Sequence, residues 1–463
     1  MLVRNDIFKR PVQRSTQPAG PLPPKNQKKE KILCWSDCVF TTTGFGTVSQ
    51  HILEALHKTG GYDIDQLAIN YFGDFFDKEK YPYGISPAKL KDPNDPYGNV
   101  MLIEALKEHE YDYLLIINDL YVTQAASKHI SPLRRAKMDV GRKPYRVIYY
   151  YPVDCQVIPQ VSGMITAADR AVAYTHFAAC ETQKTLGVDC KKPTDIIYHG
   201  TDVKAFFPLA EQEKQTLRKK MFPSEHVNAD TFIIANVNRN SPRKALATTI
   251  RAFYEFRKRV PNSILYLHAL AKDSGAGSFP VDLNIAIQQL GLQIGKDIFF
   301  PQGYSTSHGY PIEVMNKVYN VADIYISTHL GEGWGLTETE AMAAGVPVIV
   351  PNNTSTPEIV GEDGERGYVY PCKEIVYADN SGYRPAGRLD DIVGKLYEAY
   401  TDWRAGKRGE ANKRSKLIIS AREFTEQYSW DNVTKRWVEL FADLRSQTPE
   451  WQKVLSAVKG EEL

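Results

Sequence analysis

The amino-acid sequence predicts an α/β protein of two domains, each built on a parallel sheet. A chain of 463 residues is too long for one compact core. In its first half, short apolar runs alternate with amphipathic stretches, and this alternation is typical of a buried parallel sheet. The same alternation begins again after a charged stretch at 208–230. The restart predicts a second domain.

The first domain is expected over residues 31–205. Its first strand is KILCWSD at 31–37, and the stretch after it has the periodicity of a helix. The apolar face of that helix consists of Val48, Ile52, Leu53 and Leu56. Apolar runs predict further strands at 66–70, 113–118, 145–150, 170–175 and 195–200, and a helix at 99–109.

The second domain is expected over residues 228–425. It begins with a strand at 231–237 and an amphipathic helix at 242–259. Further strands are predicted at 263–270, 297–300, 323–327 and 346–350. The segment 425–460 has a long helical pattern, formed by Trp430, Val433, Trp437, Leu440 and Phe441.

The charge of the chain is unevenly distributed. The formal net charge is only +2, so the molecule as a whole has no strong field for a polyanion. Residues 1–30, by contrast, form a basic tail rich in Pro, Gln and Lys, which we expect to be flexible. The tail could contact nucleic acid or an anionic membrane, or it could only keep the N-terminus soluble.

Apolar runs and cysteines indicate a cellular location. No apolar run approaches the ~18 residues of a membrane span, and the first residues lack the apolar core of a signal peptide. We therefore expect a cytosolic protein. The six cysteines are scattered, which suits a reducing compartment. Cys34 and Cys38 have a metal-like interval but no second Cys or His pair nearby, so we interpret them as buried apolar residues.

The most informative segment is 322–360, where a predicted strand runs into the glycine-rich turn GEGWG at 331–335 and then into a helix from about Leu336. Glycines let the backbone approach a ligand closely. The amides at the start of a helix carry partial positive charge, which suits a diphosphate. Glu332 and Glu340 would be repelled by phosphate, so we expect each to accept hydrogen bonds from sugar hydroxyls.

This Glu-x7-Glu arrangement, with GWGL between the two acids and EAMAAGVPVI after, resembles the retaining GT-B glycosyltransferases, the large family of glycogen synthase, sucrose synthase and family-four mannosyltransferases. The resemblance implies two Rossmann-like domains facing a cleft, with the C-terminal helix, 426–463, returning to the N-terminal domain. It places Glu332 beside the donor sugar and Glu340 at the ribose. The backbone near the sugar and phosphates is then that of Gly333, Trp334, Gly335 and Leu336.

The resemblance also implies the reaction. A hexosyl group moves from a nucleotide diphosphate sugar, UDP- or GDP-linked, to an acceptor hydroxyl with retention of configuration. The leaving diphosphate helps to deprotonate the acceptor on the same face, so no separate base is needed. No cofactor is expected.

The segment 236–256 resembles the part of the family where an Arg after the first strand of the second domain is followed by a Lys at the start of a helix. The resemblance assigns Arg239 and Lys244 to the diphosphate, as catalytic cations. Arg243, next to Lys244, is the competing candidate.

Two further segments resemble the family in the first domain. In 196–208, His199 occupies the place of a donor-side residue, although it could equally be a histidine packed between the domains. In 41–52, Gly44 and Gly46 lie on the loop that contacts donor or acceptor in the family. These glycines could instead only shape a turn.

The chain departs from the family after the fourth strand of the first domain. Many relatives have a His-Asp pair there, with the His beside the donor sugar. Here the segment 147–156 retains Asp154 but has Pro152 and Val153 where the His is expected. Asp154 could line the donor-sugar site or cap a turn.

Several alternatives stay open. Asp63 and Asp65 form a nominal DxD, but we interpret them as preceding a strand, whereas a chelating DxD follows one, so no essential metal is predicted. A nucleotide-sugar 2-epimerase of the same fold and a non-catalytic sugar-nucleotide binder are the other functional classes. The sequence leaves the acceptor open among a glycan, a lipid, a small molecule and a modified nucleic acid base. It does not determine the oligomeric state.

Overall fold

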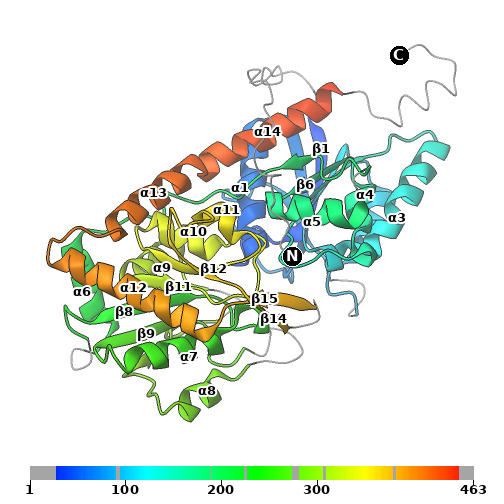
Figure 1. Cartoon of the computed structure of the whole chain (residues 1–463). Helices are drawn as coiled ribbons and strands as arrows, with labels where there is room; N and C mark the ends of the chain where they lie inside the picture. The colour runs from blue at the N-terminus through cyan, green and yellow to red at the C-terminus, as the bar shows by residue number, and fades with distance from the viewer. Residues whose placement is uncertain are drawn as a thin grey trace.

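The computed structural model describes residues 28–89, 94–187, 189–223, 227–273, 281–305, 309–378 and 382–447. These residues form two α/β units, each with a parallel sheet between helices (Figure 1). The predicted fold class is therefore confirmed. Almost all of the predicted basic tail lies outside the described residues. Within the described ranges, none of the helices has the length and apolar character that a membrane span requires.

The first domain contains a seven-stranded sheet of order β3-β2-β1-β4-β5-β6-β7. Both faces of its strands are buried: in β1, Ile32 and Cys34 pack on one side while Leu33 and Trp35 pack on the other. This double burial explains the continuous apolar runs in the sequence. The strands are β1 (Glu30–Asp37), β2 (Tyr62–Ile69), β3 (Gly84–Pro87), β4 (Tyr113–Ile117), β5 (Arg146–Tyr151), β6 (Arg170–Ala173) and β7 (Asp195–Ile196); the helices are α1 (Gly44–Lys58), α2 (Asn99–Glu108), α3 (Leu120–Asp139), α4 (Gly163–Ala167) and α5 (His176–Leu186).

The second domain contains a six-stranded sheet of order β10-β9-β8-β11-β12-β13. Its strands are β8 (Phe232–Val237), β9 (Ser263–His268), β10 (Ile298–Phe299), β11 (Ile324–Ile326), β12 (Val348–Asn352) and β13 (Tyr368–Pro371). The helices are α6 (Glu211–Met221), α7 (Leu246–Arg257), α8 (Leu283–Gln289), α9 (Ile312–Asn320), α10 (Leu336–Ala343), α11 (Thr356–Val360) and α12 (Leu389–Lys407). A separate antiparallel hairpin of β14 (Glu374–Tyr377) and β15 (Tyr383–Ala386) follows β13.

Four predicted elements differ from the structure, and one of them is the strand expected at 66–70, which begins at Tyr62. The helix expected from 242 begins only at Leu246, because Pro242–Lys244 form a 3-10 turn and Ala245 adopts a left-handed conformation with φ of 49°. The strand expected at 195–200 pairs over only Asp195–Ile196, since the chain then leaves the sheet. The long helix expected from 425 is divided into α13 (Arg414–Gln427) and α14 (Trp430–Ser446).

The break between α13 and α14 lies where the chain crosses between the domains. Thr201 and Ser429 form a β-bridge there, so the two crossings run side by side. Beyond it, α14 lies along the first domain against α1 (Figure 1). Trp437 of α14 is fully buried, with its ring 4.7 Å from that of Tyr150. The C-terminal helix therefore returns to the N-terminal domain.

Candidate active site

The glycine-rich turn follows β11 at the carboxyl edge of the second sheet, the edge where ligands bind in α/β folds. Gly335 begins α10 in a left-handed conformation with φ of 114°, and a Cβ there would lie 2.8 Å from Oε2 of Glu338. At Gly333, a Cβ would lie 2.5 Å from Cβ of Pro152 in the first domain. The turn is thus pressed against the opposite domain, and the backbone amides of the helix start lie beside it.

Glu332 is buried in this turn among positive charges. Its carboxylate pairs with Nζ of Lys244 and, at 2.9 Å, with Nη1 of Arg243. Its backbone N–H donates to Oγ1 of Thr354 at 2.9 Å. Burial alone would raise the pKa of Glu332, but the charges of Arg243 and Lys244 outweigh it and lower that pKa well below its ordinary value. Glu332 is therefore a fixed carboxylate.

Lys244 and Arg243 reach Glu332 because of the 3-10 turn after β8. Arg243 donates to the carbonyl of Gly331 at 2.5 Å, and its own carbonyl accepts from the N–H of Leu330 at 2.8 Å. These bonds join the turn to the glycine-rich segment. Burial lowers the pKa of Lys244 despite the opposing charge of Glu332.

Arg239 lies elsewhere in the structure. Its side chain is half-exposed, and its Nε pairs with Asp273 at 2.8 Å. The described contacts therefore join Glu332 to Lys244 and to Arg243, the competing candidate, but not to Arg239.

Glu340 has a different environment from Glu332. It lies about one turn into α10, where one oxygen accepts from the hydroxyl of Tyr319 at 2.6 Å. Burial raises the pKa of Glu340 to about 7, and the hydrogen bond from Tyr319 opposes that shift. Near neutral pH Glu332 is thus ionised, whereas Glu340 is partly protonated.

Sequence reasoning missed a buried pair behind the turn. Nε2 of His329 lies 3.0 Å from Oε1 of Glu338, and both side chains are almost fully buried. Nδ1 of His329 accepts from the N–H of Gly331 at 3.1 Å. The pair ties the segment before the turn to the first turn of α10. A signal existed in the sequence, since an acid on the apolar side of a short helix needs a buried partner.

On the first domain's side, Asp154 follows β5 and contacts the second domain. Its Oδ2 pairs with Nε of Arg243 at 3.2 Å. Its Oδ1 and backbone carbonyl accept from the guanidinium of Arg384 at 3.1 and 2.6 Å. Arg384 is a further residue that sequence reasoning missed. Asp154 therefore bridges the two domains.

The two glycines that follow β1, Gly44 and Gly46, pack against different parts of the molecule. A Cβ at Gly44 would lie 3.5 Å from Cδ1 of Leu336, so Gly44 faces the start of α10 across the domain boundary. A Cβ at Gly46 would lie 2.7 Å from the carbonyl of Cys38, so Gly46 is packed against its own loop.

His199 and Trp334 lie in an aromatic cluster between the domains. His199 is buried, its Nδ1 lies 2.7 Å from the hydroxyl of Tyr150, and burial lowers its pKa to about 3. The His199 ring is 4.1 Å from that of Tyr174 and 5.8 Å from that of Trp334. The ring of His199 is therefore neutral at physiological pH.

The nominal DxD lies within β2, not before a strand as the sequence suggested. Asp63 and Asp65 alternate with buried residues and are both exposed, because the parallel pairing with β1 begins at Tyr62. Nζ of Lys29 lies 3.4 Å from Asp63. Among the described residues, no three His, Cys, Asp or Glu side chains gather in a way that could hold a metal ion. Metal independence stays a prediction.

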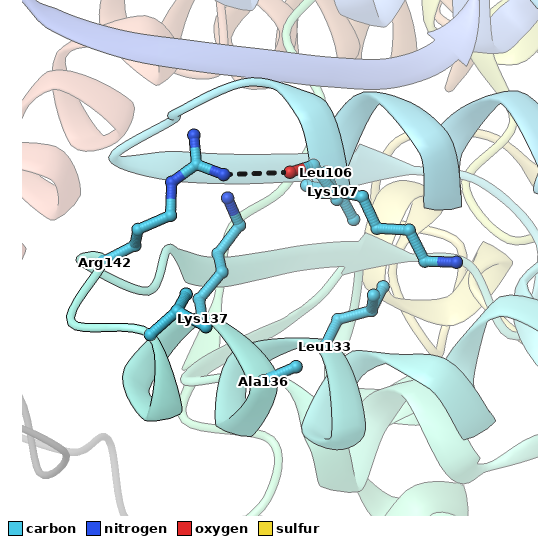
Figure 2. Close-up of a pocket in the computed structure, with 7 residues that line it drawn as sticks. Leu106, Lys107, Leu133, Ala136, Lys137 and Arg142 are labelled. Atoms are coloured by element: carbon cyan, nitrogen blue, oxygen red, sulfur yellow. Dashed lines mark hydrogen bonds between the residues drawn. The ribbon is translucent and has the colours of Figure 1, made fainter.

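A small hollow lies in the first domain, between α2 and α3 (Figure 2). Lys137 donates to the carbonyl of His109 at 2.9 Å, and Arg142 donates to that of Lys107 at 3.4 Å. The two cations thus satisfy carbonyls at the end of α2. This end precedes β4, so the hollow lies at the amino edge of the sheet, opposite to the edge that carries Asp154.

Residues 218–378 match the family model described as "Glycosyl transferases group 1". An uncharacterized glycosyltransferase of Methanocaldococcus jannaschii is 26% identical over 248 residues, which cover 53% of each chain. A D-inositol 3-phosphate glycosyltransferase of Nocardia farcinica is 28% identical over 187 residues, 40% of this chain and 38% of that protein. The matches thus span about half the length of these relatives, or less.

Solved structures share the fold over nearly the whole chain. Sucrose-phosphate synthase from Thermosynechococcus elongatus has a TM-score of 0.64 at 16% identity, covering 91% of this chain and all of that one. The Anabaena protein HepE, in complex with UDP and glucose, has a TM-score of 0.61 at 14% identity, covering 89% of this chain and 100% of that chain. The fold is therefore GT-B, and the chain resembles glycosyltransferases of family four.

Proposed function

We propose that this chain, as a GT-B protein resembling family four, is a glycosyltransferase that moves a hexosyl group from a nucleotide diphosphate sugar to an acceptor hydroxyl with retention of configuration. The observation that supports this most is the buried Glu332 between Lys244 and Arg243, beside the amides that start α10. The carboxylate proposed for the sugar is there in direct contact with the two cations proposed for the leaving group.

Lys244, Arg243 and the helix amides provide the positive charge for the diphosphate. Positioned cations and amides stabilise the charge that develops as the bond between sugar and phosphate breaks. An entering diphosphate competes with Glu332 for these two cations, since all three groups are in contact without it. The competition releases Glu332 to accept hydrogen bonds from the sugar hydroxyls. The resemblance alone assigns Arg239, five residues before Lys244 and paired with Asp273, to the diphosphate.

Glu340 is proposed to accept the ribose hydroxyls. Donor-binding roles are proposed as well for Gly44, His199 and the backbone from Gly333 to Leu336, and Gly46 shapes the loop that carries Gly44. The leaving diphosphate oxygen takes the acceptor proton on the same face of the sugar. This route to retention needs no separate base and no metal.

A UDP-linked sugar is the first donor to test, because the Anabaena structure contains UDP and glucose. The acceptor class stays open. One relative is named for inositol 3-phosphate, and another, alpha-monoglucosyldiacylglycerol synthase of Acholeplasma laidlawii, is 26% identical over 184 residues and named for a lipid.

The test is a panel of UDP-, GDP- and ADP-linked hexoses, measured by calorimetry and by donor hydrolysis with and without EDTA. We expect one nucleotide class to bind and its sugar to be hydrolysed slowly, with no loss in EDTA. Glu332→Gln is the matched control, which should bind the nucleotide but not hydrolyse the donor. The active donor is then offered with acceptor panels, and NMR reads the anomeric configuration. Binding of no nucleotide would contradict the proposal; an inverted product linkage would remove retention, and activity restored only by Mn²⁺ would remove metal independence.

A further inference from the structure

The β14–β15 hairpin carries one buried charge. Three of its side chains are largely exposed, with Ile375, Tyr377 and Tyr383 at 72%, 70% and 73%, whereas Arg384 is 1% exposed. Arginine is rarely buried without partners, because desolvating a guanidinium costs several kcal/mol, on the order of its pairing energy. Arg384 also lies beyond the residues that match the family model, 218–378. A specific contact must therefore explain its burial in this chain.

That contact crosses the domain boundary to Asp154. Nη1 of Arg384 donates to the backbone carbonyl of Asp154 at 2.6 Å, and Nη2 donates to its Oδ1 at 3.1 Å. The glycine-rich turn closes around the same point. A Cβ at Gly331 would lie 2.1 Å from the carbonyl of Asp154 and 2.9 Å from Nη1 of Arg384. Hairpin, turn and first-domain loop thus meet with no room for another side chain.

A chain of charges leads from this point to the reacting centre. The second oxygen of Asp154 pairs with Nε of Arg243 at 3.2 Å, and Nη1 of Arg243 pairs with Glu332 at 2.9 Å. Arg243 is therefore shared between two carboxylates. The share that Asp154 takes depends on how well its charge is neutralised by Arg384.

We propose that Arg384 is a positioning residue that fixes Asp154 at the closed domain boundary, so that Arg243 stays directed toward Glu332 and an entering diphosphate. Arg384 touches neither donor nor acceptor and acts through Asp154. Without it, Asp154 draws Arg243 away from Glu332, and the domains lose a cross-boundary contact. The inference rests on the proposed function, because Glu332 and Arg243 take their roles from it.

The experiment compares Arg384→Gln with Arg388→Gln, a matched control near the same hairpin. Arg388 is largely exposed and only approaches Glu374 of β14, at 3.5 Å. UDP-glucose hydrolysis gives kcat and KM, calorimetry gives the affinity for UDP, and small-angle X-ray scattering gives the domain separation. Arg384→Gln should lower kcat by about tenfold or more, because a small misplacement of a reacting group is costly. UDP affinity should fall much less than kcat, because Lys244 and the amides at the start of α10 still face the diphosphate, and the radius of gyration should rise.

A double-mutant cycle separates positioning from general stability. Since Arg384 acts through Asp154, the double variant Asp154→Asn with Arg384→Gln should lose no more kcat than the worse single variant. Arg384→Lys keeps the charge but cannot make both hydrogen bonds to Asp154, so it should recover part of kcat. It replaces Arg384→Gln in the experiment if that variant does not fold. Losses that add, or an Arg384→Gln enzyme that matches Arg388→Gln in kcat and scattering, would overturn the inference.

The failure of the proposed function has a different signature. If wild type binds no nucleotide of the panel and hydrolyses none of its donors, the proposed function is wrong. Scattering still tests the cross-boundary contact in that case. The same double-mutant cycle of Asp154 and Arg384, measured by thermal unfolding in place of kcat, tests it as well. Additive unfolding effects with an unchanged radius of gyration would then overturn the inference by themselves.

Discussion

The two sheet edges that face each other carry opposite charge. On the second domain, Lys244 and Arg243 are each paired with the carboxylate of Glu332. On the first domain, the carboxyl ends of β1, β4 and β5 lead into carboxylates, namely Asp37, Asp119 and Asp154. Burial and the charge of Asp154 raise the pKa of Asp119 to about 7, although Arg243 opposes the shift.

The two edges differ in where the opposite charges that pair with them come from. The second-domain edge contains its own charge partners, because cations and carboxylate come from the same domain. Among the described residues, the cations that pair with Asp154 are Arg243 and Arg384, and both come from the second domain. Asp154 is thus paired with these cations only when the domains are together. Donor binding should depend on residues of one domain, and turnover on contacts between two.

Replacement of Glu332 should give the largest effect and tests whether the second-domain edge binds donor by itself. Glu332→Gln should lower kcat by ~10²-fold or more, since its contacts tighten as the sugar leaves the phosphate. UDP affinity should be kept or should rise, because Glu332 no longer competes with the diphosphate for Lys244 and Arg243. Calorimetry with UDP beside steady-state kinetics checks this. A loss of UDP binding with normal kcat would give Glu332 the ribose role instead.

A matched pair of cations sharpens the same comparison. Lys244→Gln should lower kcat/KM by ~10²-fold, as expected for a group that stabilises charge on the leaving diphosphate. Arg239→Gln should change it by less than about threefold, because Arg239 is half-exposed and paired with Asp273. Equal losses in the two variants would return Arg239 to the diphosphate.

Contiguous signals in the sequence predicted the second-domain edge better than the first. The turn at 331–335 and the helix start at Leu336 were predictable, because glycines and the two acids lie within one segment. That Arg243 and not Arg239 contacts Glu332 was not predictable, since this depends on the 3-10 turn before Ala245. The Asp154–Arg384 contact joins residues 230 positions apart, one of them on a hairpin of four-residue strands without periodicity. Such a contact leaves no local pattern.

The pH dependence of nucleotide binding gives a smaller effect. Burial raises the pKa of Glu340 from 4.5 to about 7, and the proposed ribose role requires its ionised form to accept two hydroxyls. UDP affinity should therefore rise with pH up to about 7, by at most about tenfold per pH unit, and then level off. Glu340→Gln should remove this rise. Asp119→Asn is the control from the other edge and should keep it.

The raised pKa of Glu340 also makes the folding stability depend on pH. A raised pKa favours the folded state with Glu340 protonated, so this contribution is complete below about 4.5 and is lost as the pH rises through 7. The Tm of Glu340→Gln should therefore gain on that of wild type between pH 5 and 8. Parallel Tm curves would show that Glu340 does not titrate in this range.

Replacement of Glu358 should have the smallest effect and tests a contact between the domains outside the reacting centre. Glu358 of α11 accepts from the N–H groups of His176 and Phe177, at 2.9 and 2.7 Å, at the start of α5. Glu358→Gln should lower stability by about 1 kcal/mol, the effect of a charge at a helix N-terminus. Differential scanning calorimetry measures it, with the exposed Glu362→Gln as control. Equal Tm values would mean that the charge adds nothing.

The return of α14 to the first domain has a consequence for how the chain folds as it is made. Trp437 and Phe441, both fully buried, complete the core beneath α1, yet they lie about 240 residues after β7, the last strand of that sheet. A ribosome adding residues one by one releases the whole first sheet long before its covering helix exists. The apolar surface beneath α1 therefore stays exposed to water or to a chaperone while the second domain is synthesised and folds. A chain that ends early should therefore fail in its first domain and not its second.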